Sequence, residues 1–121
     1  MTTPLLAARA AVFDRLLGIW NGGDPDTVHE LITHDYLGHM LHLESGERTG
    51  FEYPGWIHAY REANPATRFR VVDQGATGDR LWTRLVATRA AGGAANGMNV
   101  SRFVGDRIAE EWAVWSPWSP T

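Results

Sequence analysis

The segment from Gly97 to Trp115 most restricts the possible fold, because it predicts a β-hairpin with a defined register. Gly105-Asp106 supplies a two-residue turn that begins with glycine, and such turns match the twist of paired strands. Side chains alternate along a strand, so residues two apart share one face of the sheet. Counting outward from the turn therefore places three cross-strand pairs on one face: Phe103 with Ile108, Ser101 with Glu110, and Asn99 with Trp112. Val114 lies on the same predicted face.

Glu110 is the unusual member of this face, because it would lie among Ile108, Trp112 and Val114. A carboxylate is rare in such surroundings unless it is paired or functional. The opposite face would place Arg102 near Glu111. That second face also carries apolar residues that need a cover, and a homodimer is expected because symmetric pairs are the commonest assemblies. These apolar residues are Val100, Val104, Ala113 and Trp115.

The rest of the chain predicts helices followed by strands. Apolar residues recur at helical spacing from Leu5 to Trp20, and Gly22-Gly23 ends this helix. Asp24 is a candidate N-cap of a short helix that reaches about Ile32. The remaining elements are a strand over Tyr36 to Leu43, a turn from Glu44 to Gly50, a helix over Phe51 to Ala63, and strands over Phe69 to Val72 and Leu81 to Arg89.

This order predicts an α+β fold in a single domain over residues 1–121. We expect a curved antiparallel sheet with about three helices on one face, which together form a cone around a pocket. The six tryptophans would suit the walls of such a pocket, although tryptophan also fills ordinary cores.

The composition restricts the partners. A net charge of −3 gives no electrostatic reason to bind nucleic acid or an anionic membrane. No cysteine is present, so disulfides and thiolate metal sites are excluded. The N-terminal apolar segment is interrupted by Arg9, Asp14 and Arg15, so we expect neither a signal peptide nor a membrane span, and a cytoplasmic location is the default.

His39 and Glu110 are the candidate acid/base pair, because each lies on a predicted apolar face. Burial would move the titration of both groups toward neutral pH, where proton transfer is efficient. Each has an alternative interpretation. His39 could be a core histidine bonded to the backbone, and Glu110 could be a structural partner of Arg84 or Arg102.

Further polar and aromatic residues complete the predicted site. Tyr36 and Asn99 could donate hydrogen bonds to a developing enolate, although both also occur as ordinary core or strand residues. The histidines show no common geometry that would hold a metal. The residues expected to bind substrate are Trp20, Trp56, Tyr60, Trp82, Arg84, Ser101, Phe103 and Trp112.

Four stretches resemble one family in their order along the chain. They are WNGGDPDTVHELITHDYLGH from Trp20, WIHAYREANPATRFRVVD from Trp56, GDRLWTRLVAT from Gly78 and SRFVGDRIAEEWAVW from Ser101. They are similar to SnoaL-like polyketide cyclases of the nuclear transport factor two-like superfamily. The resemblance implies the cone-shaped α+β fold. It also implies a pocket for acid/base chemistry on a polyketide-like carbonyl compound, with no metal or cofactor.

Within this resemblance, His39 matches the histidine that follows the Asp-Tyr pair, and Glu110 matches an Ile-x-Glu pattern. The chain departs from stretches common in the family at Ala87-Thr88-Arg89 and Trp115-Ser116. We expect an enzyme that catalyses an intramolecular, aldol-like cyclisation. The alternatives are a dehydratase, an isomerase, an epoxide hydrolase, or a non-catalytic module for ligand binding or dimerisation, since one fold supports many functions.

Overall fold

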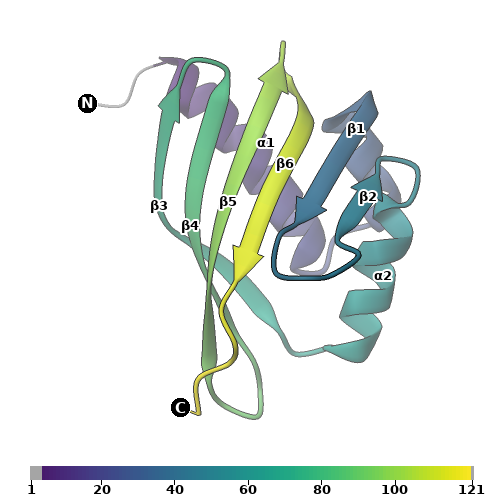
Figure 1. Ribbon diagram of the computed structural model, residues 1–121, viewed down its shortest axis with the longest axis vertical. Helices are drawn as coiled ribbons and strands as arrows, with labels where there is room; N and C mark the ends of the chain where they lie inside the picture. The colour runs from purple at the N-terminus through teal and green to yellow at the C-terminus, as the bar shows by residue number, and fades with distance from the viewer. Residues whose placement is uncertain (1–3, 121) are drawn as a thin grey trace.

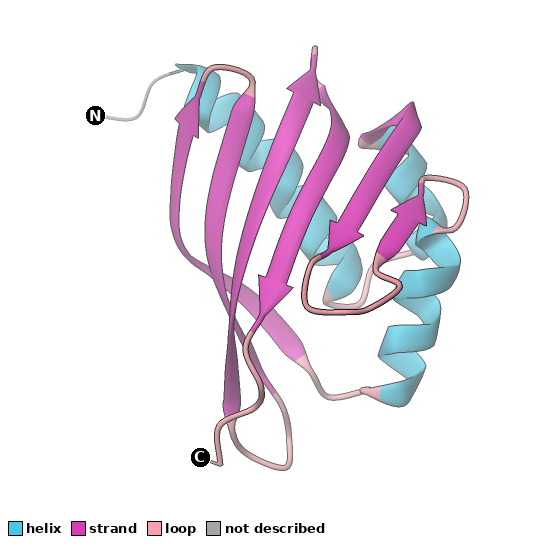
Figure 2. Ribbon diagram, in the orientation of Figure 1, coloured by secondary structure: helices cyan, strands magenta, loops and turns pink. Residues whose placement is uncertain are grey.

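A computed structural model describes residues 4–120 of the chain. Figure 2 shows its helices, strands and loops. The elements in chain order are α1 (Pro4–Trp20), the 3₁₀ helix η1 (Pro25–Glu30), β1 (Ile32–Met40), β2 (Glu47–Thr49), α2 (Tyr53–Ala63), β3 (Arg68–Thr77), β4 (Arg80–Thr88), β5 (Ala94–Val104) and β6 (Arg107–Trp115).

The strands form one curved sheet in the order β2-β1-β6-β5-β4-β3, and α1 crosses one face of it (Figure 1). The predicted α+β class and curved sheet are confirmed. Neighbouring strands are antiparallel except β1 and β6, which run parallel, so the sheet is mixed rather than wholly antiparallel. The predicted turn after β1 contains the short strand β2, and β3 continues beyond the predicted end at Val72.

Helix α1 forms where the sequence predicts it. It buries Phe13, Leu16 and Leu17, which the spacing of 3 to 4 residues places on one stripe of the helix. The helix ends at Trp20, and Gly22 follows with a positive φ of 135°. The side chain of Asn21 then exchanges two hydrogen bonds of 2.8 Å with the backbone of Phe69 in β3. These bonds attach the end of α1 to the sheet.

The second predicted helix forms as a 3₁₀ helix that is shorter than expected. The Asp24 side chain accepts a hydrogen bond of 3.0 Å from the Asp26 N–H, which confirms the predicted N-cap. Helix α2 ends at Ala63, as the following Asn64-Pro65 predicts. The Arg61 side chain of α2 donates hydrogen bonds to backbone carbonyls at the end of α1, which orients the two helices relative to each other.

The register of the final hairpin differs from the prediction by one residue after the first pair. Phe103 pairs with Ile108, as expected, but Ser101 pairs with Glu111 and not with Glu110. A β-bulge at Ile108-Ala109 inserts an extra residue, and both of these residues are buried. A bulge reverses which side chains beyond it face the core. The predicted face was therefore wrong for Glu110, Trp112 and Val114.

The bulge divides the sheet into two faces whose members we name from the observed register. The inner face, toward α1, carries Tyr36 and Gly38 of β1, Asn99, Ser101 and Phe103 of β5, and Glu111, Ala113 and Trp115 of β6. The outer face carries His39, Trp82, Met98, Val100, Arg102, Val104, Glu110, Trp112 and Val114. Ala113 and Trp115 were predicted on the outer face and lie on the inner one.

Candidate active site

A cavity of about 890 Å³ lies between the inner face of the sheet and the two α-helices. Its walls are mainly apolar and aromatic, and its polar side chains are few. Tyr36, Asn99 and Glu111 border it from the sheet. Trp20 borders it from α1, and Trp56 and Tyr60 border it from α2, as the sequence predicted for these three aromatic residues. This combination is typical of small-molecule sites.

Glu111 is the acidic side chain that borders this cavity, and it is 5% exposed. Its Oε1 accepts a hydrogen bond of 2.8 Å from the Tyr36 hydroxyl. Its Oε2 accepts bonds of 2.7 Å from the Ser101 hydroxyl and 2.9 Å from the Asn99 amide. The Asn99 amide also donates to Ser101 over 2.9 Å. Three residues of the predicted site thus surround one carboxylate, which is the neighbour of the predicted one.

The surroundings of Glu111 change the chemistry of the cluster. Burial raises the pKa of Glu111 above the usual 4.5, and the hydrogen bonds from Ser101, Asn99 and Tyr36 oppose this rise. Burial and the adjacent Glu111 charge raise the pKa of Tyr36 well above 10.0. Tyr36 therefore keeps its proton near neutral pH and acts as a hydrogen-bond donor, while Glu111 is the group that can exchange a proton.

Gly38 provides the space that the Tyr36 hydroxyl occupies. A Cβ atom at Gly38 would lie 2.8 Å from the Tyr36 Oη and 3.3 Å from two carbons of its ring. Real Cβ atoms do not approach so closely without displacing a neighbour. Gly38 also pairs directly with Glu111 across β1 and β6. The missing side chain at Gly38 thus allows the phenol to reach the carboxylate.

A second layer of aromatic residues supports Tyr36. The Tyr53 ring of α2 lies 5.2 Å from the Tyr36 ring, measured between centroids. The Trp20 indole N–H donates to the Tyr53 hydroxyl over 3.2 Å. Burial also raises the pKa of Tyr53. Sequence reasoning missed Tyr53; its place at the start of a predicted helix gave no signal that it would face Tyr36.

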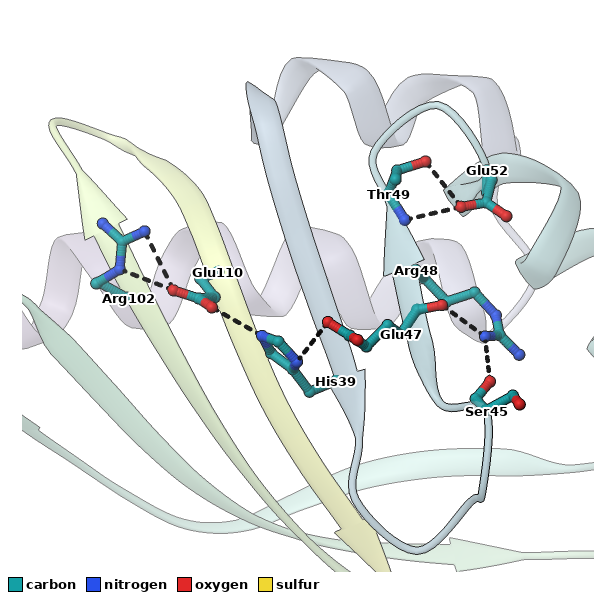
Figure 3. Close-up of polar contacts among 8 residues, drawn as sticks. All are labelled: His39, Ser45, Glu47, Arg48, Thr49, Glu52, Arg102 and Glu110. Carbon is teal, nitrogen blue, oxygen red and sulfur yellow. Dashed lines mark hydrogen bonds and ion pairs between the residues drawn. The ribbon is translucent and has the colours of Figure 1, made fainter.

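The predicted pair of His39 and Glu110 forms, but on the outer face of the sheet. The His39 Nε2 lies 2.7 Å from the Glu110 Oε2, and its Nδ1 lies 3.5 Å from Glu47. Arg102 contacts the other oxygen of Glu110 at 3.3 Å, so the four side chains form a row across the strands (Figure 3). The hydrogen bond from His39 and the contacts with Arg102 lower the pKa of Glu110.

The predicted inward position of Glu110 was wrong, and Glu110 contacts Arg102, one of the two arginines that the alternative interpretation named. His39 borders the cavity, but its two ring nitrogens contact carboxylates on the outer face, and its ring stacks on Trp112 at 5.6 Å. Glu110 does not border the cavity, so the pair does not lie inside it.

The other predicted substrate-binding residues lie away from the cavity. Trp82, Arg84 and Trp112 are on the outer face, where Trp82 and Arg84 are exposed. Phe103 and Ser101 are on the inner face but do not border the cavity; Phe103 is part of the core and Ser101 contacts Glu111. The structure therefore does not place these five residues on the cavity wall, where the sequence predicted them.

Within residues 4–120, no cluster of three or more His, Asp or Glu side chains could hold a metal ion. No helix in the same part of the chain is long and apolar enough to cross a membrane.

Comparison with protein families assigns the chain. The sequence model of the SnoaL-like domain matches residues 13–111, which is most of the chain. The protein belongs to the SnoaL-like domain family. Comparison with curated protein sequences finds no match.

Solved structures share this SnoaL-like fold. IdmH of Streptomyces antibioticus, described as "a putative polyketide cyclase", is 24% identical, with a TM-score of 0.78 over 89% of this chain and 91% of IdmH. A loop-truncation variant of IdmH is 26% identical, with a TM-score of 0.78 over 89% of this chain and 92% of that one. An NTF2-like protein of unknown function from Mesorhizobium loti is 20% identical, with a TM-score of 0.75 over 97% of this chain and 98% of that chain.

Proposed function

We propose that the protein is a cofactor-independent enzyme that transfers protons next to the carbonyl group of a hydrophobic substrate. The finer proposal is an intramolecular, aldol-like cyclisation of a polyketide-like compound. One observation carries the proposal: the buried Glu111 carboxylate, held by three donors, borders a large apolar cavity. The similarity to IdmH, described as "a putative polyketide cyclase", supports the same substrate class.

Glu111 would act as the base through Oε1. Oε2 already accepts two hydrogen bonds, whereas Oε1 accepts one and retains a lone pair for a substrate proton. When Oε1 takes the proton from the carbon next to the carbonyl, the electron pair of that C–H bond forms an enolate. The Tyr36 hydroxyl, released from a now neutral carboxyl group, can then donate to the enolate oxygen.

The cyclisation would follow within the same cavity. The enolate carbon attacks a second carbonyl carbon of the substrate, which forms the new C–C bond and an alkoxide. The proton on Glu111 returns to that alkoxide, so the enzyme ends in its starting state. A substrate that fills the mainly apolar cavity would displace water, which would otherwise protonate the enolate first.

Asn99 has a positioning role in this scheme. Its amide donates to both Glu111 and Ser101, so it orients the carboxylate rather than the substrate. The proposed catalytic residues are therefore Glu111 and Tyr36.

The first step can be measured without knowledge of the natural substrate. 2-Tetralone is a hydrophobic bicyclic ketone with exchangeable protons next to its carbonyl group. In D₂O, the purified protein should accelerate deuterium incorporation at this position, followed by NMR, above the rate in buffer. A rate equal to that in buffer would favour a binding module over an enzyme.

The raised pKa of Glu111 predicts how stability depends on pH. Because burial raises the pKa of this group on folding, its ionisation opposes folding once the pH exceeds the usual 4.5. The free energy of unfolding of the wild type should therefore fall, relative to Glu111→Gln, as the pH rises from 4.5 through the folded-state pKa. Below 4.5 the difference should be constant. Urea unfolding from pH 4 to pH 8 measures it, and a difference that moves the other way would contradict a raised pKa.

We propose further that the outer face binds a second copy of the chain. Its exposed apolar side chains are Trp82, Met98, Val104 and Val114, of which Val104 is 56% exposed. A symmetric pair would remove this area from water. Light scattering coupled to size-exclusion chromatography should give twice the mass of one chain, and Val114→Asp should give the mass of a single chain. A wild-type monomer would contradict the proposal.

A further inference from the structure

Arg48 is the one arginine among the described residues that border the cavity, and it lies on the same side of the sheet as Glu111. Arg48 in β2 pairs with Gly38 in β1, and Gly38 pairs with Glu111 in β6. Two strand spacings separate the backbones of Arg48 and Glu111 by about 10 Å. The residue between them is a glycine, and the phenol of Tyr36 lies over it.

The guanidinium group of Arg48 is held in one orientation. Its Cζ lies 3.2 Å from the centroid of the Trp56 ring, so the group stacks on the wall that α2 contributes. Its Nη1 donates to the backbone carbonyls of Ser45 and Glu47, each over 2.7 Å (Figure 3). These contacts fix the group before any ligand binds.

One edge of the guanidinium remains without a protein acceptor. The Arg48 Nε is shielded from solvent and has no hydrogen-bond partner in the described part of the chain. No carboxylate of residues 4–120 forms an ion pair with Arg48. The positive charge of Arg48 at the cavity wall is therefore not neutralised by an ion pair, and a negatively charged group of a ligand in the cavity would neutralise it.

We propose that Arg48 binds the carboxylate of an acidic substrate whose reacting carbonyl carbon lies near Glu111. The planar guanidinium carries N–H donors and a fixed positive charge, which match the oxygens and the negative charge of a carboxylate. The substrate class is therefore a hydrophobic keto acid with its acid group and its acidic C–H at opposite ends. The reacting carbonyl group of this substrate rests on the proposed function, whereas the binding of its carboxylate by Arg48 does not.

Equilibrium binding tests Arg48 separately from catalysis. The probes are 2-naphthylacetate and its neutral methyl ester, which differ in charge but share the apolar ring. At pH 8, isothermal titration calorimetry should show that the wild type binds the acid about ten- to a hundredfold more tightly than the ester. Arg48→Gln should lose this preference and keep the affinity for the ester, which also shows that the cavity is intact.

Arg80→Gln is the matched control. Arg80 also stacks on a tryptophan, Trp112, at 4.9 Å, but on the outer face, so the variant makes the same change in net charge away from the cavity. It should retain the preference for the acid. The proposal would be overturned if the wild type bound the acid and the ester with equal affinity, if Arg48→Gln kept the preference for the acid, or if the wild type bound neither probe. Deuterium exchange in 2-tetralone, which has no carboxylate, does not depend on Arg48, so either proposal can fail alone.

Discussion

Glu111→Gln should slow deuterium exchange in 2-tetralone by about two to four orders of magnitude. The amide has nearly the shape of the carboxyl group but cannot take a proton from carbon at neutral pH. Its oxygen can still accept from Ser101 and Asn99, and its nitrogen can donate to Tyr36 Oη, so the polar cluster keeps its partners. The loss should therefore appear in the rate rather than in the fold.

Glu110→Gln is the natural control, because the two residues are adjacent in sequence and lie on opposite faces of β6. Glu110 contacts His39 and Arg102 outside the cavity, so its variant should exchange protons within about twofold of the wild type. Circular dichroism and urea unfolding verify that both variants fold. An undiminished rate in Glu111→Gln would remove this residue from the mechanism, and a large loss in Glu110→Gln alone would restore the interpretation based on the sequence.

The difference between these two glutamates also shows the limit of sequence reasoning. The turn at Gly105-Asp106 and the first pair, Phe103 with Ile108, were predictable, because turn geometry fixes the register next to it. The bulge at Ile108-Ala109 was not predictable in this way, because simple alternation of side chains assumes that no extra residue is inserted in the strand. Ile108 and Ala109 are adjacent apolar residues followed by two glutamates, and this break in alternation is the sequence signal that could have indicated a bulge.

On β1 the sequence pattern misled for a different reason. The alternation predicts that the more apolar of the two sets of side chains faces the core. That set is Leu37, His39, Leu41 and Leu43. The structure instead turns Tyr36 and Gly38 inward, where Tyr36 joins the hydrophobic core and borders the cavity. Leu41 and Leu43 lie beyond the strand and are exposed.

Helices and caps were predicted more reliably than the site, since they depend on local signals. Apolar spacing located α1, and Asp24 located the start of η1. The contact of Tyr53 with Tyr36 and the place of Arg48 on the cavity wall depend on how distant segments pack. Neither residue has a local motif, so only the structure brings them into the site.

Gly38→Ala should reduce proton exchange by about a hundredfold, although the change adds a single methyl group. The new Cβ would lie 2.8 Å from the Tyr36 Oη, so the hydroxyl must move away from Glu111. The site would then lose the donor proposed for the enolate, and loss of one such donor typically lowers a rate by about 10²- to 10³-fold. Gly38 has no positive φ, so alanine fits its backbone and the effect should come from the side chain.

A double-mutant cycle with Tyr36→Phe tests this cause directly. Phenylalanine lacks the hydroxyl that the new methyl group would displace, so Gly38→Ala should cost much less in a Tyr36→Phe background than in the wild type. The matched control is Gly55→Ala in α2, where an added Cβ has no heavy atom within 4 Å and the rate should not change. Additive losses in the cycle would mean that Gly38 acts on something other than the Tyr36 hydroxyl. In that case the proposed donor role of Tyr36 would lose its structural basis, because it depends on the phenol lying over this glycine.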